Sequence, residues 1–321
     1  MPEEYTYAVA RIHTKENAML SAQDLERLLS ASGFDEAVSI LTEKGFDTLN
    51  ITSSDELLSR EREKTYKLIS EMVEDMSVFD VFFYENDFQN LKAAVKSVIT
   101  KDKADKVFVS GGTVAPELIK KAVETREFAD LPEFLRDTAE ISLKSLMETG
   151  DGGLCDVIID KAYLETVLKK GEESDNQMIK RYAELLVALA DIRIAARGAR
   201  LGKSVEFFKR SLAECRTVSV SSMAQAAAKG TEELNSYLLT TDYSGVVEIL
   251  KESYVAFEKW CDNRMMEEIR KERFNQFTIA PLAAYILARE TEIKMVGLIL
   301  TAKQNKLDTS VIRERLRELY V

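Results

Sequence analysis

The sequence predicts an all-helical protein built from related segments. Its 321 residues include only four prolines and thirteen glycines, while the helix formers Ala, Leu, Glu, Lys and Arg are abundant. Apolar residues recur at three- and four-residue steps, the period of a helix face. Three triplets, Asn90-Leu91-Lys92, Asp191-Ile192-Arg193 and Glu292-Ile293-Lys294, run polar, aliphatic, basic, and their basic residues are 101 residues apart in both intervals. This spacing indicates a long internal repeat.

The N-terminal part of the chain precedes the first full repeat. Ser21 suits a helix N-cap, and Gly33 suits a helix end. The expected helices cover residues 2–19, 22–29, 34–41 and 55–76. Residues 8–15, followed by Ser21, resemble a partial copy of the repeat.

The three repeats begin near residues 77, 156 and 242. The first has an aromatic-rich helix ending near residue 100, a loop at 102–112, and helices from Pro116 and Pro132 up to a glycine-rich break at 150–153. The expected helices of the second and third cover residues 156–170, 173–201, 205–215, 246–273 and 281–304. Further helices are expected after a cap near Ser219, from Thr231, and after a cap at Asp308 or Thr309. We place domain boundaries at 1–110, 111–215 and 216–321. The alternative to a true internal repeat is that amphipathic helices resemble one another by chance.

Composition argues against several classes of protein. A net charge of −11 disfavours nucleic acid as a partner, because phosphate binding needs clustered cations. The acidic start Met1-Pro2-Glu3-Glu4 does not resemble a signal peptide, and no run reaches the ~20 apolar residues of a membrane span. The three cysteines lack a CxxC spacing, which predicts reduced, buried thiols.

The sequence offers no catalytic, cofactor-binding or metal-ligating set. His13 is the only histidine, so any His-based site or catalytic triad would have to use it. The segment from Gly198 to Ser204 resembles a phosphate loop, yet it has one residue too few between its glycines and follows a helical pattern where a strand is required. We interpret it as a helix end followed by a glycine turn.

A basic stripe forms the candidate partner interface. Its members recur at helical spacing on an otherwise acidic chain: Arg193, Arg197, Arg200 and Lys203. Lys92 and Lys96 occupy the first two positions in the first repeat, whereas the third has Lys294 and Leu298. One interpretation is a solvated or internally paired face. The other is a docking face for an acidic partner or a membrane-associated assembly.

The two ends of the chain resemble the C subunit of bacterial and archaeal V-type (A/V-type) ATPases, which is similar to the eukaryotic d subunit. The resemblance is carried by residues 5–11, 21–29, 281–293 and 312–321. It implies an all-helical funnel of three domains about a pseudo-threefold axis, with no catalytic role and no cofactor. It also implies a peripheral socket on the cytoplasmic side of the membrane, linking the central stalk to the proteolipid rotor ring and carrying torque for H⁺ or Na⁺ transport.

If the chain has the architecture that this resemblance implies, the triplets are structural positions rather than parts of an active site. We expect the polar residues Asn90, Asp191 and Glu292 to hold helices together, alongside their basic partners Lys92, Arg193 and Lys294. Two alternatives stay open: a free-standing helical-repeat adaptor that binds regulatory proteins, and an all-helical enzyme.

Overall fold

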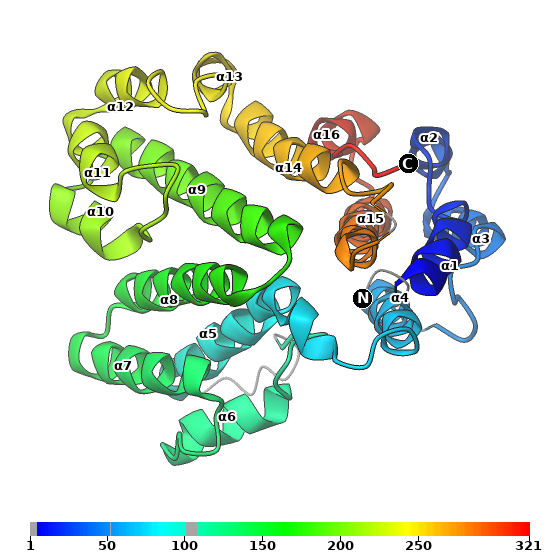
Figure 1. Cartoon of the computed structure of the whole chain (residues 1–321), viewed down its shortest axis with the longest axis horizontal. Coiled ribbons are helices and arrows are strands. Elements are labelled where there is room, and N and C mark those ends of the chain that lie inside the picture. The colour runs from blue at the N-terminus through cyan, green and yellow to red at the C-terminus, as the bar shows by residue number, and fades with distance from the viewer. Residues whose placement is uncertain (1–4, 52, 101–107, 276) are drawn as a thin grey trace. The chain divides into compact units, whose positions relative to one another are not determined.

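A computed structural model describes residues 5–51, 53–100, 108–275 and 277–321. All regular secondary structure in these ranges is helical, which confirms the predicted all-α class (Figure 1). Most of the loop expected at 102–112 lies outside the described residues.

The chain forms two compact units. Unit 1 combines the two ends, Met1–Val78 and Glu252–Val321, and unit 2 is the continuous stretch Phe79–Lys251. The three-domain division stays a prediction.

Unit 1 is organised around one long buried helix, α15. Its helices are α1 (Thr6–Glu16), α2 (Ala22–Ser30), α3 (Phe34–Glu43), α4 (Ser54–Ser70), α14 (Tyr254–Arg270), α15 (Ala280–Gln304) and α16 (Thr309–Arg315). The 3-10 helix η1 (Met76–Phe82) follows α4 and continues into the segment of unit 2. Helices α1, α3, α4, α14 and α16 all contact α15. Because α15 is surrounded, its sequence is apolar on nearly every side rather than along one stripe. Pro281 occupies its first turn, as predicted.

Unit 2 is organised around the antiparallel pair α8 and α9. Its helices are α5 (Tyr84–Thr100), α6 (Pro116–Thr125), α7 (Glu133–Thr149), α8 (Gly152–Glu173), α9 (Gln177–Arg200), α10 (Val205–Ser211), α11 (Val220–Lys229), α12 (Thr231–Leu238) and α13 (Val246–Glu252). Helices α5 and α7 contact α8, while α11 and α12 contact α9. Gly171 permits the close approach of α8 to α9, since a Cβ there would lie 2.3 Å from the Ala183 Cβ.

Several expected helices have different limits in the structure. The helix expected at 55–76 ends at Ser70, and the one expected at 156–170 spans Gly152–Glu173. The first spans Thr6–Glu16 rather than residues 2–19, of which 1–4 are outside the described residues. The helix expected at 205–215 ends at Ser211, because the N–H of Ala213 bonds to the Asp191 side chain at 3.1 Å. The helix expected at 246–273 is divided by Ser253, whose side chain caps α14 by accepting the N–H of Ala256 at 3.0 Å.

Candidate functional site

The polar residue of each triplet is fully buried. Asn90 on α5, Asp191 on α9 and Glu292 on α15 each have 0% exposed surface. Buried polar groups are costly unless they are hydrogen-bonded. In all three cases the partner is the backbone of a loop that leads into another helix.

In the first triplet, Asn90 makes two hydrogen bonds to the backbone of Val109. Its Nδ2 donates to the Val109 carbonyl at 2.9 Å, and its Oδ1 accepts the Val109 N–H at 2.8 Å. One turn earlier, the Asp87 carboxylate accepts the N–H groups of Thr113 at 3.0 Å and Val114 at 2.9 Å. Together the two side chains fix the loop that leads into α6.

In the second triplet, Asp191 accepts the Ala213 N–H in the loop between α10 and α11. Two turns earlier, Glu184 accepts the N–H groups of Arg216 at 2.8 Å and Thr217 at 2.7 Å. Burial raises the pKa of Asp191 to about 8, and the bond from Ala213 only partly opposes this shift. Burial also raises the pKa of Asp87.

In the third triplet, the loop comes from the opposite end of the chain. Glu292 accepts the N–H of Leu20, which lies between α1 and α2 and is 272 residues away in sequence. Ser21 then caps α2 in a reciprocal pair with Asp24, as the sequence predicts for this cap. The N-terminal segment therefore supplies the loop that the third triplet binds.

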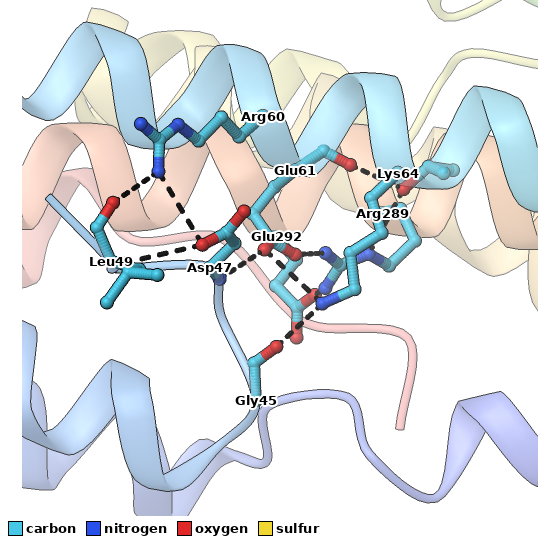
Figure 2. Close-up of polar contacts among 9 residues, drawn as sticks. Gly45, Asp47, Leu49, Arg60, Glu61, Lys64, Arg289 and Glu292 are labelled. Carbon is cyan, nitrogen blue, oxygen red and sulfur yellow. Dashed lines mark hydrogen bonds and ion pairs between the residues drawn. The ribbon is translucent and has the colours of Figure 1, made fainter. Parts of the chain in front are cut away.

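Glu292 also belongs to a buried charge cluster, which Figure 2 shows. The Arg289 guanidinium pairs with Glu292 through Nη1 and with Glu61 of α4 through Nη2, at 2.6 Å from the Glu61 Oε2. The other oxygen of Glu61 accepts the Asp47 N–H at 2.8 Å. Glu61 and Arg289 are 1% and 7% exposed, so this cluster ties α4 and the loop before it to α15.

The basic members of the triplets differ from one another. Lys92 pairs with Asp160 of α8, and Lys96 pairs with Asp156 of the same helix at 2.7 Å. These two cations of the first repeat therefore hold α5 against α8. Arg193 is half-buried and Lys294 is exposed.

The four residues of the candidate partner interface also differ from one another in their exposure. Arg197, Arg200 and Lys203 are exposed, whereas Arg193 is half-buried. Arg200 donates to the carbonyl of Leu250 at 3.0 Å, so it connects α9 to α13. The Lys203 ammonium lies 5.3 Å from the centroid of the Phe207 ring. Arg197 and Lys203 are thus the outward-facing members of the stripe.

The segment that resembles a phosphate loop is a helix end. Helix α9 precedes it, and Gly202 adopts a left-handed backbone with φ +63. The N–H of Lys203 closes the turn by donating to the Gly198 carbonyl at 3.0 Å. The preceding strand that a phosphate loop requires is replaced by a helix.

Sequence reasoning missed four residues of this buried framework: Asp87, Glu184, Arg289 and Glu61. The first three carried a signal, because each lies three or seven residues before the polar residue of a triplet. That spacing places each of these side chains on the same helix face as the polar residue of its triplet. Glu61 carried none, since its partner Arg289 is 228 residues away.

His13 and the three cysteines were the other residues considered for catalysis or metal binding. His13 lies in the last turn of α1, with its Nδ1 3.0 Å from Glu16. Cys155 and Cys261 are buried and Cys215 is half-buried, all as free thiols. Across the described ranges, no group of three or more His, Cys, Asp or Glu side chains is placed to bind a metal ion. No helix in those ranges is both long and apolar enough to cross a membrane.

Comparison with known proteins matches residues 8–315 to the family described as ATP synthase (C/AC39) subunit. The chain is 24% identical to the C subunit of the V-type sodium ATPase of Enterococcus hirae, over 99% of each protein. It is 23% identical to the C subunit of the A-type ATP synthase of Methanocaldococcus jannaschii, over 98% of this chain and 86% of that protein. It is 22% identical to the C subunit of a V-type ATP synthase of Thermus thermophilus, over 93% of this chain and 94% of that protein.

Proposed function

The chain belongs to the ATP synthase C/AC39 subunit family, and from this we propose that it is a non-catalytic coupling subunit of a V-type or A-type rotary ATPase. In this role it is a socket that joins the central stalk to the proteolipid ring on the cytoplasmic face of the membrane. It transmits torque between ATP hydrolysis or synthesis and the movement of H⁺ or Na⁺. The family match over residues 8–315 is the observation that carries the proposal.

The buried polar framework supports a mechanical role. A part that carries torque must deform little under load, so its long helices need fixed connections to the loops between them. Asn90, Asp191 and Glu292 provide such connections through bonds to loop backbone. A hydrogen bond that a loop N–H donates to a buried side-chain oxygen is directional, and breaking it leaves that buried oxygen unsatisfied.

The recurrence of this bond also supports the pseudo-threefold arrangement as part of the proposal. The first two triplets bind a loop 19 and 22 residues further along the chain. The third binds a loop from the N-terminal end. A ring of three similar helical segments that begins and ends within one segment would have this connectivity.

The proposal is tested by comparing ATP hydrolysis with ATP-driven ion uptake in membrane vesicles from a strain that lacks this chain. We expect uptake to fall more than hydrolysis, because a complex that lacks the coupling part hydrolyses ATP without driving the ring. Adding the purified full-length chain should restore uptake. Equal ion uptake with and without the chain would refute the coupling role.

A further inference from the structure

We infer that the C-terminal end of α9 and the adjoining helix α10 form a docking surface for an acidic protein surface on another subunit of the same complex. The surface, here called the α9–α10 basic patch, consists of Arg197, Leu201, Lys203, Lys209 and Arg210. The inference rests on the proposed function, since it assigns one contact through which the chain is held in its assembly.

Positive charge is concentrated in this patch, although the chain as a whole is acidic. Residues 197–216 contain six Lys or Arg and two Glu, whereas the whole chain carries a net charge of −11. The four cations of the patch are all exposed. Within the described part of the chain, none of the four forms an ion pair with a carboxylate, in contrast to Lys92 and Lys96. The patch therefore presents four cations that form no ion pair with any described residue, with the exposed Glu206 as the carboxylate between Lys203 and Lys209.

The backbone beneath the patch is firmly held. Figure 1 shows α10 at the C-terminal end of α9, next to α11. Phe208 of α10 is fully buried, and a Cβ added to Gly198 of α9 would lie 2.4 Å from its ring. Lys161 of α8 donates to the carbonyl of Lys209 at 3.1 Å. The charged side chains thus project from a fixed scaffold, which lowers the entropic cost of ordering them on binding.

The apolar side chains indicate a protein partner rather than a lipid surface. A helix that lies on a membrane turns Phe, Trp or Leu side chains outward into the lipid. Here Phe208 is turned inward, and Phe207 is half-buried beneath the Lys203 ammonium. Leu201, at the end of α9, is 65% exposed. One aliphatic contact beside several cations fits a surface with carboxylates and a small apolar area, and Arg197 can bind a carboxylate in bidentate fashion.

The test reverses the charge of the patch in the full-length chain. The variant carries Arg197→Glu, Lys203→Glu, Lys209→Glu and Arg210→Glu. The matched control carries Lys121→Glu, Lys144→Glu, Lys169→Glu and Lys229→Glu, which are four exposed lysines elsewhere in unit 2. Each set changes the net charge by the same amount. A third variant, with Gln at the four patch positions, separates loss of attraction from repulsion and preserves the test if the Glu variant fails to fold.

Binding is measured to the ATPase complex solubilised from membranes of a strain that lacks this chain. We expect the Kd of the patch variant to rise at least about tenfold at low salt, since complementary charges across an interface hold partners together. The control should stay within about twofold, because charge changes outside a contact act weakly. Wild-type affinity should fall between about 50 and 300 mM salt, as screening shortens the range of charge interactions.

Each outcome has a separate meaning. If the wild-type chain does not bind the complex, the proposed function fails and this inference fails with it. If wild type, control and both patch variants bind equally, the proposed function stands and the docking surface is refuted. Vesicles of phosphatidylglycerol, compared with phosphatidylcholine, test the lipid alternative. Patch-dependent binding to anionic vesicles, with unchanged binding to the complex, would overturn the assignment to a protein partner.

Discussion

Replacing Arg289 by Met should destabilise unit 1 by about 3–5 kcal/mol, the usual cost of removing one partner from a buried ion pair. The guanidinium pairs with two carboxylates, Glu61 and Glu292, which are 1% and 0% exposed. It also lies 5.3 Å from the centroid of the Phe46 ring. Methionine retains much of the buried volume, so the loss measures the charge contacts rather than a cavity. Glu292 would lose its cation, and Glu61 would keep only its longer pair with the exposed Lys64, at 3.4 Å.

Trp260 provides the assay, because it is the only tryptophan of the chain and lies on α14 in unit 1. Its fluorescence during urea denaturation reports the stability of this unit. The matched control is Arg313→Met, since Arg313 makes two contacts with Glu26 at an exposed position, at 2.5 and 2.7 Å. The control should leave the midpoint unchanged, because solvent screens an exposed pair.

A further variant tests the cause of the loss. Adding Glu61→Gln and Glu292→Gln to Arg289→Met removes the two buried carboxylate charges and keeps oxygen acceptors for the N–H groups of Asp47 and Leu20. We expect it to recover much of the stability. A loss below about 1 kcal/mol for Arg289→Met, or no recovery in the triple variant, would show that the cluster does not hold α4 to α15 as described.

Three other changes follow from the contacts in unit 2, with stability measured by urea denaturation monitored by circular dichroism. Asp191→Asn should flatten the pH dependence of the free energy of unfolding. The pKa of Asp191 is about 8 in the folded protein and 3.8 ordinarily, so the folded state holds the proton more tightly. Wild-type stability should therefore fall as pH rises from about 4 to 8, by up to about 1.4 kcal/mol per pH unit. An unchanged slope would contradict this. Asn90→Ala should cost about 0.5–1.5 kcal/mol for each of the two hydrogen bonds lost to the Val109 backbone, and faster hydrogen exchange at the Val109 amide should accompany it. Gly198→Ala should destabilise by about 1–3 kcal/mol despite the better helix propensity of Ala, because its Cβ would meet the buried Phe208 ring; a stabilised variant would refute this packing.

Local features of the fold were predictable from the sequence. Scarce Gly and Pro predicted long helices, and Ser21, Ser219 and Asp308 cap helices where expected. These signals depend on a few neighbouring residues, so the sequence contains them directly. The end of α10 was not predictable in this way, because Ala213 is drawn out of the helix by Asp191, which is 22 residues earlier.

Long-range pairing accounts for the rest of the framework. The repeat spacing identified Asn90, Asp191 and Glu292, and the structure buries all three. The spacing could not predict that Glu292 binds the N–H of Leu20, because this bond depends on the two chain ends folding into one unit. Likewise, helical periodicity selected Arg193 and Arg200 as a stripe with Arg197. The partial burial of Arg193 and the bond from Arg200 to the Leu250 carbonyl depend on neighbouring helices that a single-helix pattern does not include.

Affinity purification of the tagged full-length chain from solubilised membranes of its own host tests the coupling role most directly. We expect proteolipid ring subunits and central stalk subunits to be recovered together with the chain, in constant proportion across preparations. Recovery of the chain without either kind of subunit, under conditions that keep the ATPase intact, would contradict its assignment as the coupling subunit.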